Sequence, residues 1–354
     1  MAFSPISMEL PHPSAKWLLL PLAWLYRLAL SVRSLYFKSV HPPEKLGRPT
    51  IKVGNIIVGG TGKTPFVIYL AKLLKRRNLQ PVVLTRGYGR RSSGLIKVTG
   101  QGGSHSNAVL TGDEPQLISQ QVRCPVYVCE DRRVGAEAAL QEYPYATFVL
   151  DDAYQQLGIH SDVSFLLIDA TNPFDNGYLL PAGKLREPLH EIRRADAFVV
   201  TRADHPFDQD WLVETLKKHN HAAPLFFAYN EAVGLQEVPN GAWSPMAEFR
   251  GKSVMMMCAI GNPAIFQSDI AHHQMLIRHR LLFPDHHFYA QSDIDRALHE
   301  AAEQAADVIV TTEKDAVKLE GLKIPPKTIY ALGIETRVDE EESFLEFLRI
   351  FLDI

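Results

Sequence analysis

A glycine-rich loop that joins an apolar strand to a helix constrains this chain more than any other feature of its sequence. Residues 59–64 read Gly-Gly-Thr-Gly-Lys-Thr, after a strand-like run and before a helical pattern at residues 65–74. In this context the loop amides and the helix N-terminus face phosphate oxygens, the lysine reaches the β and γ phosphates, and the last threonine binds Mg²⁺. We therefore predict that ATP and Mg²⁺ are bound by Gly59, Gly60, Thr61, Gly62, Lys63 and Thr64.

The loop departs from the commonest phosphate-binding pattern at one position. In Gly-x-x-x-x-Gly-Lys-Ser/Thr the first glycine would fall on Ile57, so Gly59 and Gly60 must make the turn instead. A glycine-rich turn before an ordinary helix is disfavoured, because Lys63 and Thr64 stand at both required offsets. The loop is interpreted as a variant phosphate-binding loop.

Short apolar runs alternate with helical patterns along most of the chain. Such alternation is typical of a mostly parallel sheet with helices on both faces. A second cluster of strands and helices begins near residue 253. We predict an α/β fold of the P-loop NTPase type with an amphipathic membrane-docking helix at 1–40, a P-loop core domain at 41–235 and a smaller C-terminal α/β lobe at 236–354.

Composition excludes several classes of function. The formal net charge is -3, so no overall field favours nucleic acid, and we predict no nucleic-acid partner. Cys124, Cys129 and Cys258 form no Cys-x-x-Cys pair, which argues against a disulfide framework and a structural zinc site. A reducing, cytosolic setting follows. The sequence does not reveal the oligomeric state.

The amino-terminal segment needs an apolar partner. Residues 17–30 read Trp-Leu-Leu-Leu-Pro-Leu-Ala-Trp-Leu-Tyr-Arg-Leu-Ala-Leu, with basic residues on both sides. The run is shorter than the roughly 20 apolar residues that span a bilayer, and Pro21 and Arg27 interrupt it, so we predict a helix in the membrane interface. Packing on the protein's own domain, a signal peptide and a true span are the alternatives. In the interface, four aromatic side chains would sit at headgroup level: Trp17, Trp24, Tyr26 and Tyr36.

Aspartates follow two of the predicted strands. Asp151 comes directly after the apolar run at 148–150, where a P-loop protein places the carboxylate that holds its metal ion. Asp152 is a second metal ligand, an acceptor-side group or a turn residue. Asp169 ends another strand in the same way and ranks second to Asp151.

Three stretches carry groups suited to an acceptor hydroxyl, which needs a proton acceptor and positive charge near the transferred phosphate. Residues 112–115, Gly-Asp-Glu-Pro, offer carboxylates that could instead cap a helix. Residues 85–91, Thr-Arg-Gly-Tyr-Gly-Arg-Arg, suit an anion-contacting loop or a solvated turn. Residues 283–287, Phe-Pro-Asp-His-His, offer imidazoles that could instead serve packing.

Together these stretches resemble the tetraacyldisaccharide 4′-kinase family, the lipid A 4′-kinases of Gram-negative bacteria. The resemblance runs through nearly the whole chain, and the order and spacing of its motifs are more specific than any P-loop alone. The amino-terminal helix resembles the family's membrane-docking element. The matching motifs lie at residues 53–55, 58–65, 86–90, 112–115, 151–152, 176–177, 179–183, 185–188, 283–286 and 312–315.

The resemblance implies ATP- and Mg²⁺-dependent phosphorylation of the 4′-hydroxyl of a tetraacyldisaccharide 1-phosphate, giving lipid IVA in lipid A biosynthesis. The reaction would take place at the cytoplasmic face of the bacterial inner membrane. Asp113 would be the general base with His286 tuning or orienting it, and Asp152 would share in catalysis. A carboxylate with a pKa of about 4 is a weak base, so a paired imidazole that stabilises the transferred proton makes physical sense.

The resemblance also implies further ligands. The metal ligands would be Thr64, Asp151 and Glu114, and the substrate-binding residues would be Arg86, Tyr88, Arg90, Asn176 and Arg186. The family usually reads Asp-Asp-Gly-x-Gln-His where this chain reads Asp-Asp-Ala-Tyr-Gln-Gln at 151–156. Gln156 must therefore replace any contact of the family's histidine, and it cannot carry charge.

Two other functions fit parts of the sequence. A membrane-bound switch ATPase of the deviant-Walker type would bind partners without phosphorylating an acceptor, although such proteins carry a lysine near the start of the loop, where this chain has Val58. A kinase for a soluble sugar is the second alternative. ATP consumption without lipid distinguishes the first from a lipid kinase, and deletion of the residues before His41 distinguishes the second. Acyl-chain preference, the depth of helix insertion and the exact metal ligands cannot be derived from the sequence.

Overall fold

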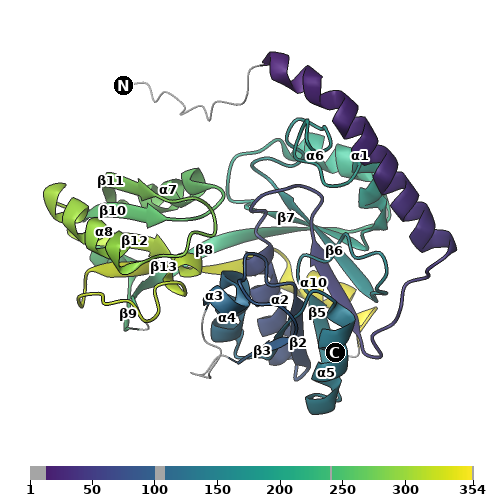
Figure 1. Ribbon diagram of the computed structural model, residues 1–354, viewed down its shortest axis with the longest axis horizontal. Helices are drawn as coiled ribbons and strands as arrows, with labels where there is room; N and C mark the ends of the chain where they lie inside the picture. The colour runs from purple at the N-terminus through teal and green to yellow at the C-terminus, as the bar shows by residue number, and fades with distance from the viewer. Residues whose placement is uncertain (1–12, 100–107, 240, 353–354) are drawn as a thin grey trace.

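One thirteen-stranded sheet runs through both lobes of the molecule in the computed structural model, which describes residues 13–99, 108–239 and 241–352, without the side chains of 13–17 (Figure 1). The strand order is β11-β10-β12-β13-β8-β7-β6-β1-β5-β2-β4-β3, with β9 beside β8. The core half is parallel except for its last strand, β3, which runs antiparallel to β4. Its strands are β1 (Thr50–Gly54), β2 (Gln80–Thr85), β3 (Ile96–Val98), β4 (Val126–Val128), β5 (Ala146–Leu150), β6 (Val163–Asp169) and β7 (Ala197–Thr201).

Helices cover both faces of the core half, as predicted. Alternate residues of β6 face opposite sides, so Phe165 joins one buried cluster and Leu166 another. The cluster of Phe165 includes α2 (Lys63–Arg76), α4 (Asp113–Val122) and α10 (Glu341–Arg349). The opposite face carries α5 (Arg132–Glu142) and α6 (Gln209–His219). Two short elements complete this half, α3 (Ala108–Thr111) and the 3₁₀ helix η1 (Leu189–Arg194).

Two long strands connect the lobes. The first residues of β8 (Leu225–Glu237) pair in parallel with β7, and the rest pairs antiparallel with β13 (Ile329–Val338). Figure 1 shows β8 and β13 passing from the core into the second lobe. That lobe contains β9 (Trp243–Ser244), the 3₁₀ helix η2 (Met246–Phe249), β10 (Ser253–Cys258), α7 (Pro263–His272), β11 (Leu276–Leu282), α8 (Gln291–Glu303), β12 (Val308–Thr312) and α9 (Glu313–Ala316).

The observed packing differs in detail from the predicted division of the chain at 235/236. That boundary falls inside β8, and α10 packs on the core although it lies within 236–354. Its Phe344 ring lies 5.4 Å from the Phe165 ring and 5.0 Å from the Phe226 ring. The apolar face of α10 thus completes the core after the chain has returned from the second lobe along β13.

The amino-terminal helix is long and mostly uncovered. Helix α1 (Pro13–Ser39) contains Pro21 and lies along the edge of the core (Figure 1). By length and composition its part Leu18–Ser39 is long and apolar enough to cross a membrane. Large apolar side chains on it are exposed, among them Leu18, Trp24, Leu28, Val32 and Leu35. The first twelve residues of the predicted 1–40 region, and the side chain of Trp17, lie outside the described part.

Candidate active site

The phosphate loop is shaped by polar contacts from neighbouring strand ends. Helix α2 begins directly after Gly62, whose φ of 74° is the left-handed conformation that glycine adopts without strain. Asn55 Nδ2 donates to Ile57 O at 2.8 Å and to Thr61 Oγ1 at 2.7 Å. Thr201 Oγ1, at the end of β7, donates to Thr61 O at 2.9 Å. The loop is therefore held in shape by the protein itself.

Residues 184–187, here named the flanking segment, lie beside this loop. Val58 N donates to Lys184 O at 2.9 Å, and Arg186 N donates to Ile56 O at 2.7 Å. This pairing brings the Arg186 side chain to the carboxylate that follows β5. Its Nη1 lies 2.8 Å and 3.1 Å from the two carboxylate oxygens of Asp152.

Asp152 lies between two cations at the mouth of the loop. Its Oδ1 is 3.9 Å from Lys63 Nζ, and its other partner is Arg186. Burial alone raises the pKa of Asp152, but the charges of Lys63 and Arg186 outweigh burial, so the pKa lies below its usual range. Asp152 is therefore ionised at neutral pH and fixes the position of the Lys63 ammonium.

Asp151 is buried at the end of β5, and one of its oxygens lacks a partner. Oδ2 accepts a hydrogen bond from Thr85 Oγ1 at 3.1 Å, whereas Oδ1 has no hydrogen-bond partner among the described residues. Burial, with the nearby carboxylates of Glu114 and Asp152, raises the pKa of Asp151 to about 7 against the opposing effect of Lys63 and Arg132. Arg132 is itself buried and donates to Asp151 O at 2.8 Å.

These groups fit a magnesium ion that depends on the nucleotide. A buried carboxylate oxygen without a partner, close to a second carboxylate, is suited to a hard cation. Within the described residues no cluster of three or more acidic, histidine or cysteine side chains forms a complete metal site. Mg²⁺ commonly takes only one or two protein carboxylates, with phosphate and water completing its shell. Thr64 and Glu114 line the same cleft as Asp151.

A single cleft of about 1250 Å³ joins the two lobes at this point. Residues 59–64 line it from the core side, with Asp151, Asp152 and Arg186. The second lobe contributes His286 and Lys314. The cleft thus places the phosphate loop and the predicted acceptor groups in one continuous space.

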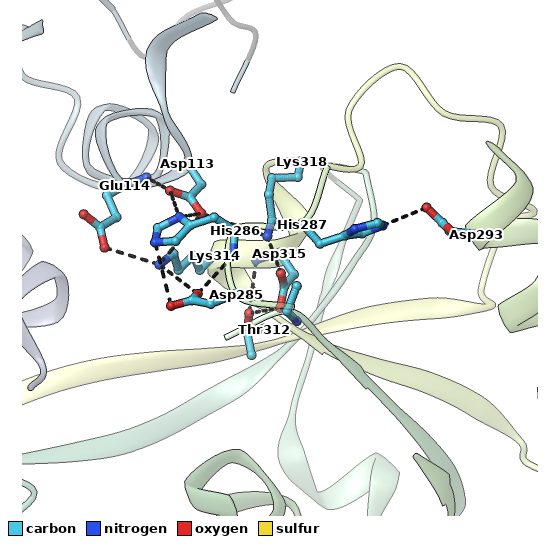
Figure 2. A network of polar contacts seen from close by, with 11 residues as sticks. Asp113, Glu114, Asp285, His286, His287, Asp293, Thr312, Lys314, Asp315 and Lys318 are labelled. Carbon is cyan, nitrogen blue, oxygen red and sulfur yellow. Dashed lines mark hydrogen bonds and ion pairs between the residues drawn. The ribbon is translucent and has the colours of Figure 1, made fainter. Parts of the chain in front are cut away.

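Asp113 and His286 form a pair across the lobes (Figure 2). His286 Nδ1 lies 3.0 Å from Asp113 Oδ2 and 3.3 Å from Oδ1. Asp113 is only 4% exposed at the start of α4, whereas His286 lines the cleft. The hydrogen bond to Asp113 raises the pKa of His286 above its ordinary value, against the opposing effect of burial. Burial alone raises the pKa of Asp113, but the His286 hydrogen bond and neighbouring lysines hold it below its usual range.

Two lysines surround this pair, and the sequence motifs did not predict a role for either of them. Lys314 Nζ lies 3.3 Å from Glu114 Oε1 and 3.8 Å from Asp113 Oδ2. Lys318 Nζ lies 4.0 Å from Asp113 Oδ2 and 2.7 Å from Asp315 Oδ1 (Figure 2). The side chains of Lys318 and Asp315 are almost fully buried. Lys314 belongs to the motif at 312–315, but local spacing does not reveal which carboxylate a lysine meets across the lobes.

Two of the predicted substrate-binding residues line the cleft in the loop after β2. They are Arg86, whose side chain is exposed, and Tyr88, which is 71% exposed. The Tyr88 ring meets the His286 ring edge to face at a centroid distance of 5.1 Å. Gly87, with φ of 69°, turns the chain where a Cβ would lie 2.3 Å from Val128. This loop therefore places an aromatic ring beside His286 and a cation in the lining of the same cleft.

Arg90 and Asn176 are placed differently from the prediction. Arg90 forms an ion pair with Glu130 and donates to Gly94 O at 2.7 Å, and its side chain is almost fully buried. Asn176 Nδ2 donates to Ala182 O at 3.1 Å within its own loop. Neither belongs to the cleft lining in the described part of the chain. Both side chains are used to hold loops in place.

The structure also bears on the second metal candidate, Asp169 at the end of β6, and on Gln156, which follows β5. Asp169 is paired with Arg202 and accepts hydrogen bonds from Thr171, so Asp151 is the better metal candidate. At the family's histidine position, the backbone O of Gln156 accepts from Lys52 Nζ at 2.8 Å. The structure thus gives a role to the Gln156 backbone, and the role of its side chain stays a prediction.

The fold and this cleft define a nucleotide-binding protein of the P-loop class, with an acid–imidazole pair beside the phosphate loop. The family model for tetraacyldisaccharide-1-P 4′-kinase matches residues 15–352. The chain belongs to this family. A tetraacyldisaccharide 4′-kinase of Halothermothrix orenii is 34% identical over 332 residues, covering 88% of this chain and 86% of the relative.

Other relatives agree with this assignment. A tetraacyldisaccharide 4′-kinase of Shewanella denitrificans is 36% identical over 306 residues, covering 86% of this chain and 84% of the relative. The crystal structure of LpxK from Aquifex aeolicus in complex with ATP matches with a TM-score of 0.77 at 32% identity, covering 96% of this chain and all of that one. The resemblance inferred from the motifs and the predicted fold class are confirmed.

Proposed function

We propose that the protein transfers the γ-phosphate of ATP to the 4′-hydroxyl of a tetraacyldisaccharide 1-phosphate, giving lipid IVA in lipid A biosynthesis. The observation that carries this proposal is the Asp113–His286 pair, whose imidazole lines the same cleft as a preformed phosphate loop while the buried carboxylate lies behind it. A nucleotide switch needs the loop but has no need of a proton acceptor beside it. Membership of the tetraacyldisaccharide 4′-kinase family supports the identity of the acceptor.

The transfer forms one bond to phosphorus, breaks another and moves one proton. The acceptor oxygen forms a bond to the γ-phosphorus, the bond from that phosphorus to the bridging oxygen of ADP breaks, and the hydroxyl proton passes to the Asp113–His286 pair. Asp113 is the general base, and His286 stabilises the proton because its pKa is raised by the carboxylate. Lys63, paired with Asp152, stabilises the negative charge on the phosphoryl group as it is transferred.

Magnesium and the remaining contacts follow from the same arrangement. Mg²⁺, when bound, neutralises charge on the β and γ phosphates, and Asp151, Thr64 and Glu114 would hold it. Arg186, in the flanking segment, holds Asp152, and Asp152 pairs with Lys63 of the loop. Tyr88 is placed to contact the acceptor because its ring meets the His286 ring, and Arg86 lines the same cleft.

Helix α1 supports a place at the membrane. Its exposed apolar side chains would cover a large area if they entered the headgroup region, and the lipid acceptor is found there. We therefore propose that the helix lies at the cytoplasmic face of the inner membrane, where ATP is available. Trp24 and Tyr36 remain candidates for headgroup-level contacts, whereas Tyr26 turns its hydroxyl toward the core.

The test is incubation of the full-length protein with γ-labelled ATP, Mg²⁺ and vesicles that contain tetraacyldisaccharide 1-phosphate. A labelled product with phosphate on the 4′ position, formed only when the lipid is present, supports the proposal. Rapid ATP hydrolysis in the absence of lipid, with no labelled lipid formed when lipid is added, would instead support the switch ATPase. Phosphorylation of a deacylated, soluble disaccharide at equal kcat/KM would favour a soluble-sugar kinase.

A further inference from the structure

The main polar contact of helix α1 with the core leads directly to the phosphate loop. Tyr26 Oη donates a hydrogen bond to Arg186 O at 2.8 Å. Arg186 lies in the flanking segment, and its own N–H donates to Ile56 O in the loop at 2.7 Å. Its guanidinium holds Asp152, which in turn lies 3.9 Å from Lys63 Nζ. Arg186 alone thus connects the helix to the loop backbone, and Arg186 with Asp152 connects it to the loop lysine.

A second path starts about two turns further along α1. Arg33 Nη2 donates to Gln155 O. The side chain of Gln155 donates to Asn55 O at 2.8 Å and to Glu187 Oε2 at 3.2 Å, so it connects the loop entrance with the flanking segment. Asn55 is the residue that bonds Thr61 inside the loop. Both paths therefore end on the backbone that shapes the nucleotide site.

The remaining contacts of α1 are sparse by comparison. Phe37 lies on Gly158, where any Cβ would come within 2.9 Å of its ring, so the helix end is seated closely on the core. Most of the apolar side chains point away from the protein. A helix that only served as an apolar anchor would need no hydrogen bonds to carbonyls next to the catalytic carboxylates.

We propose that α1 braces the phosphate loop, with Tyr26 and Arg33 as positioning residues for ATP. The outer face of the helix serves the membrane, and its inner face holds the flanking segment and Gln155 against the loop. This inference rests on the proposed function only in taking the outer face as membrane-docking. Nucleotide affinity, which needs no lipid, is therefore its direct measure.

The test compares two substitutions with two matched controls on the same helix in the full-length protein. Tyr26→Phe removes one hydroxyl, and Tyr36→Phe removes a hydroxyl from a ring that contacts Phe37 and His41. Arg33→Met removes the Gln155 contact, and Arg27→Met removes an arginine that lies over the Trp24 ring. The dissociation constant of MgATP is measured by calorimetry without lipid, and vesicle binding is measured by co-sedimentation.

We expect Tyr26→Phe to weaken MgATP binding roughly two- to ten-fold, as loss of one positioned hydrogen bond allows. Arg33→Met should have a smaller effect because its hydrogen bond to Gln155 O is exposed to solvent, so water can replace the arginine. The control variants should bind MgATP like the wild type. With lipid present, KM for ATP should rise in Tyr26→Phe while KM for the lipid stays unchanged.

Equal MgATP affinity in Tyr26→Phe, Arg33→Met and the two controls would overturn the inference, even if the melting temperature fell. That result would leave Tyr26 with a purely structural role in seating the helix. Failure of the wild type to phosphorylate the lipid would refute the proposed function instead, and it would leave the affinity comparison intact.

Discussion

His286 Nδ1 lies 3.0 Å from Asp113 Oδ2 although the two residues belong to different lobes. The carboxylate starts α4 in the core, and the imidazole follows β11 in the second lobe. Proton acceptance at this site therefore depends on how the two lobes meet. The two groups titrate as a pair, so an apparent pKa measured by kinetics belongs to both.

The pH dependence of turnover should report this pair. Asp113 raises the pKa of His286, and the form that accepts a proton carries an ionised Asp113 with a neutral imidazole. The kcat should therefore rise with pH through an apparent pKa above the ordinary histidine value of about 6.5. In His286→Ala this limb should vanish, with kcat lowered roughly 100-fold or more. Full turnover of His286→Ala across pH would refute the pair.

Asp151→Asn should stabilise the protein while abolishing its activity. Burial raises the pKa of Asp151 to about 7, far above that of the unfolded chain, so the folded state binds the proton more tightly. This contribution is fully present below the unfolded value and is lost as pH rises through about 7. At pH 8, without nucleotide, we expect the asparagine variant to gain roughly 2 kcal/mol in unfolding free energy.

Denaturant unfolding at pH 8 and at pH 4 measures this effect. At pH 4 Asp151 is mostly protonated in the folded protein, so the difference between the variant and the wild type should largely disappear. A lower stability of the asparagine variant at pH 8 would contradict the assignment.

Substitution of Arg186 should affect phosphate transfer from ATP more than binding of the lipid. Its guanidinium contacts Asp152, which holds Lys63, so Arg186→Met should weaken the hold on the transferred phosphate. We expect kcat to fall roughly 10- to 100-fold while KM for the lipid changes little. Steady-state kinetics with each substrate varied in turn checks this. A selective rise of the lipid KM would instead support the predicted role of Arg186 in acceptor binding.

Lys318 and Asp315 should behave as a buried ion pair. Their side chains are 2% and 0% exposed, and Asp315 Oδ2 also accepts hydrogen bonds from Ala259 N and Thr312 Oγ1. Lys318→Met alone leaves a buried carboxylate without its cation and should cost roughly 3 kcal/mol or more of unfolding free energy. Lys318→Met combined with Asp315→Asn should recover much of this loss, because the amide oxygen still accepts both hydrogen bonds.

Thermal and denaturant unfolding of both variants measures this, and Lys323→Met is the control because Lys323 is exposed in the same lobe. Additive losses in the double variant would show that the two side chains do not act as a pair.

Arg90→Met should lower stability and spare the kinetic constants. Arg90 is paired with Glu130 and lies outside the described cleft lining, so the folded variant should keep its KM for both substrates. We expect a loss of roughly 1–2 kcal/mol in unfolding free energy. A raised lipid KM in the folded variant would instead support the predicted substrate contact.

Much of the fold could be predicted because its signals are local. The order of glycine, lysine and threonine at 59–64 fixes a strand, a loop and a helix within a few residues of one another. Local signals do not predict the different positions of the arginines at 86 and 90. Both stand in one glycine-rich loop, yet one lines the cleft and the other turns to Glu130, and nothing within the loop distinguishes them.

Long-range pairing is the second limit. The apolar face of α10 could be expected from its spacing, but the spacing does not reveal which lobe it covers, and Phe344 packs in the core. The contact between Asp113 and His286 joins positions 173 residues apart. Resemblance to known kinases suggested this contact, whereas local chemistry offered only a carboxylate and an imidazole.

The two-stranded connection of β8 and β13 has a consequence for variation in this enzyme family. The lobes are joined by a narrow ribbon of hydrogen bonds, so a bend of a few degrees there moves the imidazole relative to its carboxylate. Sequence changes in the ribbon can therefore tune the rate while every residue that meets the substrates stays the same.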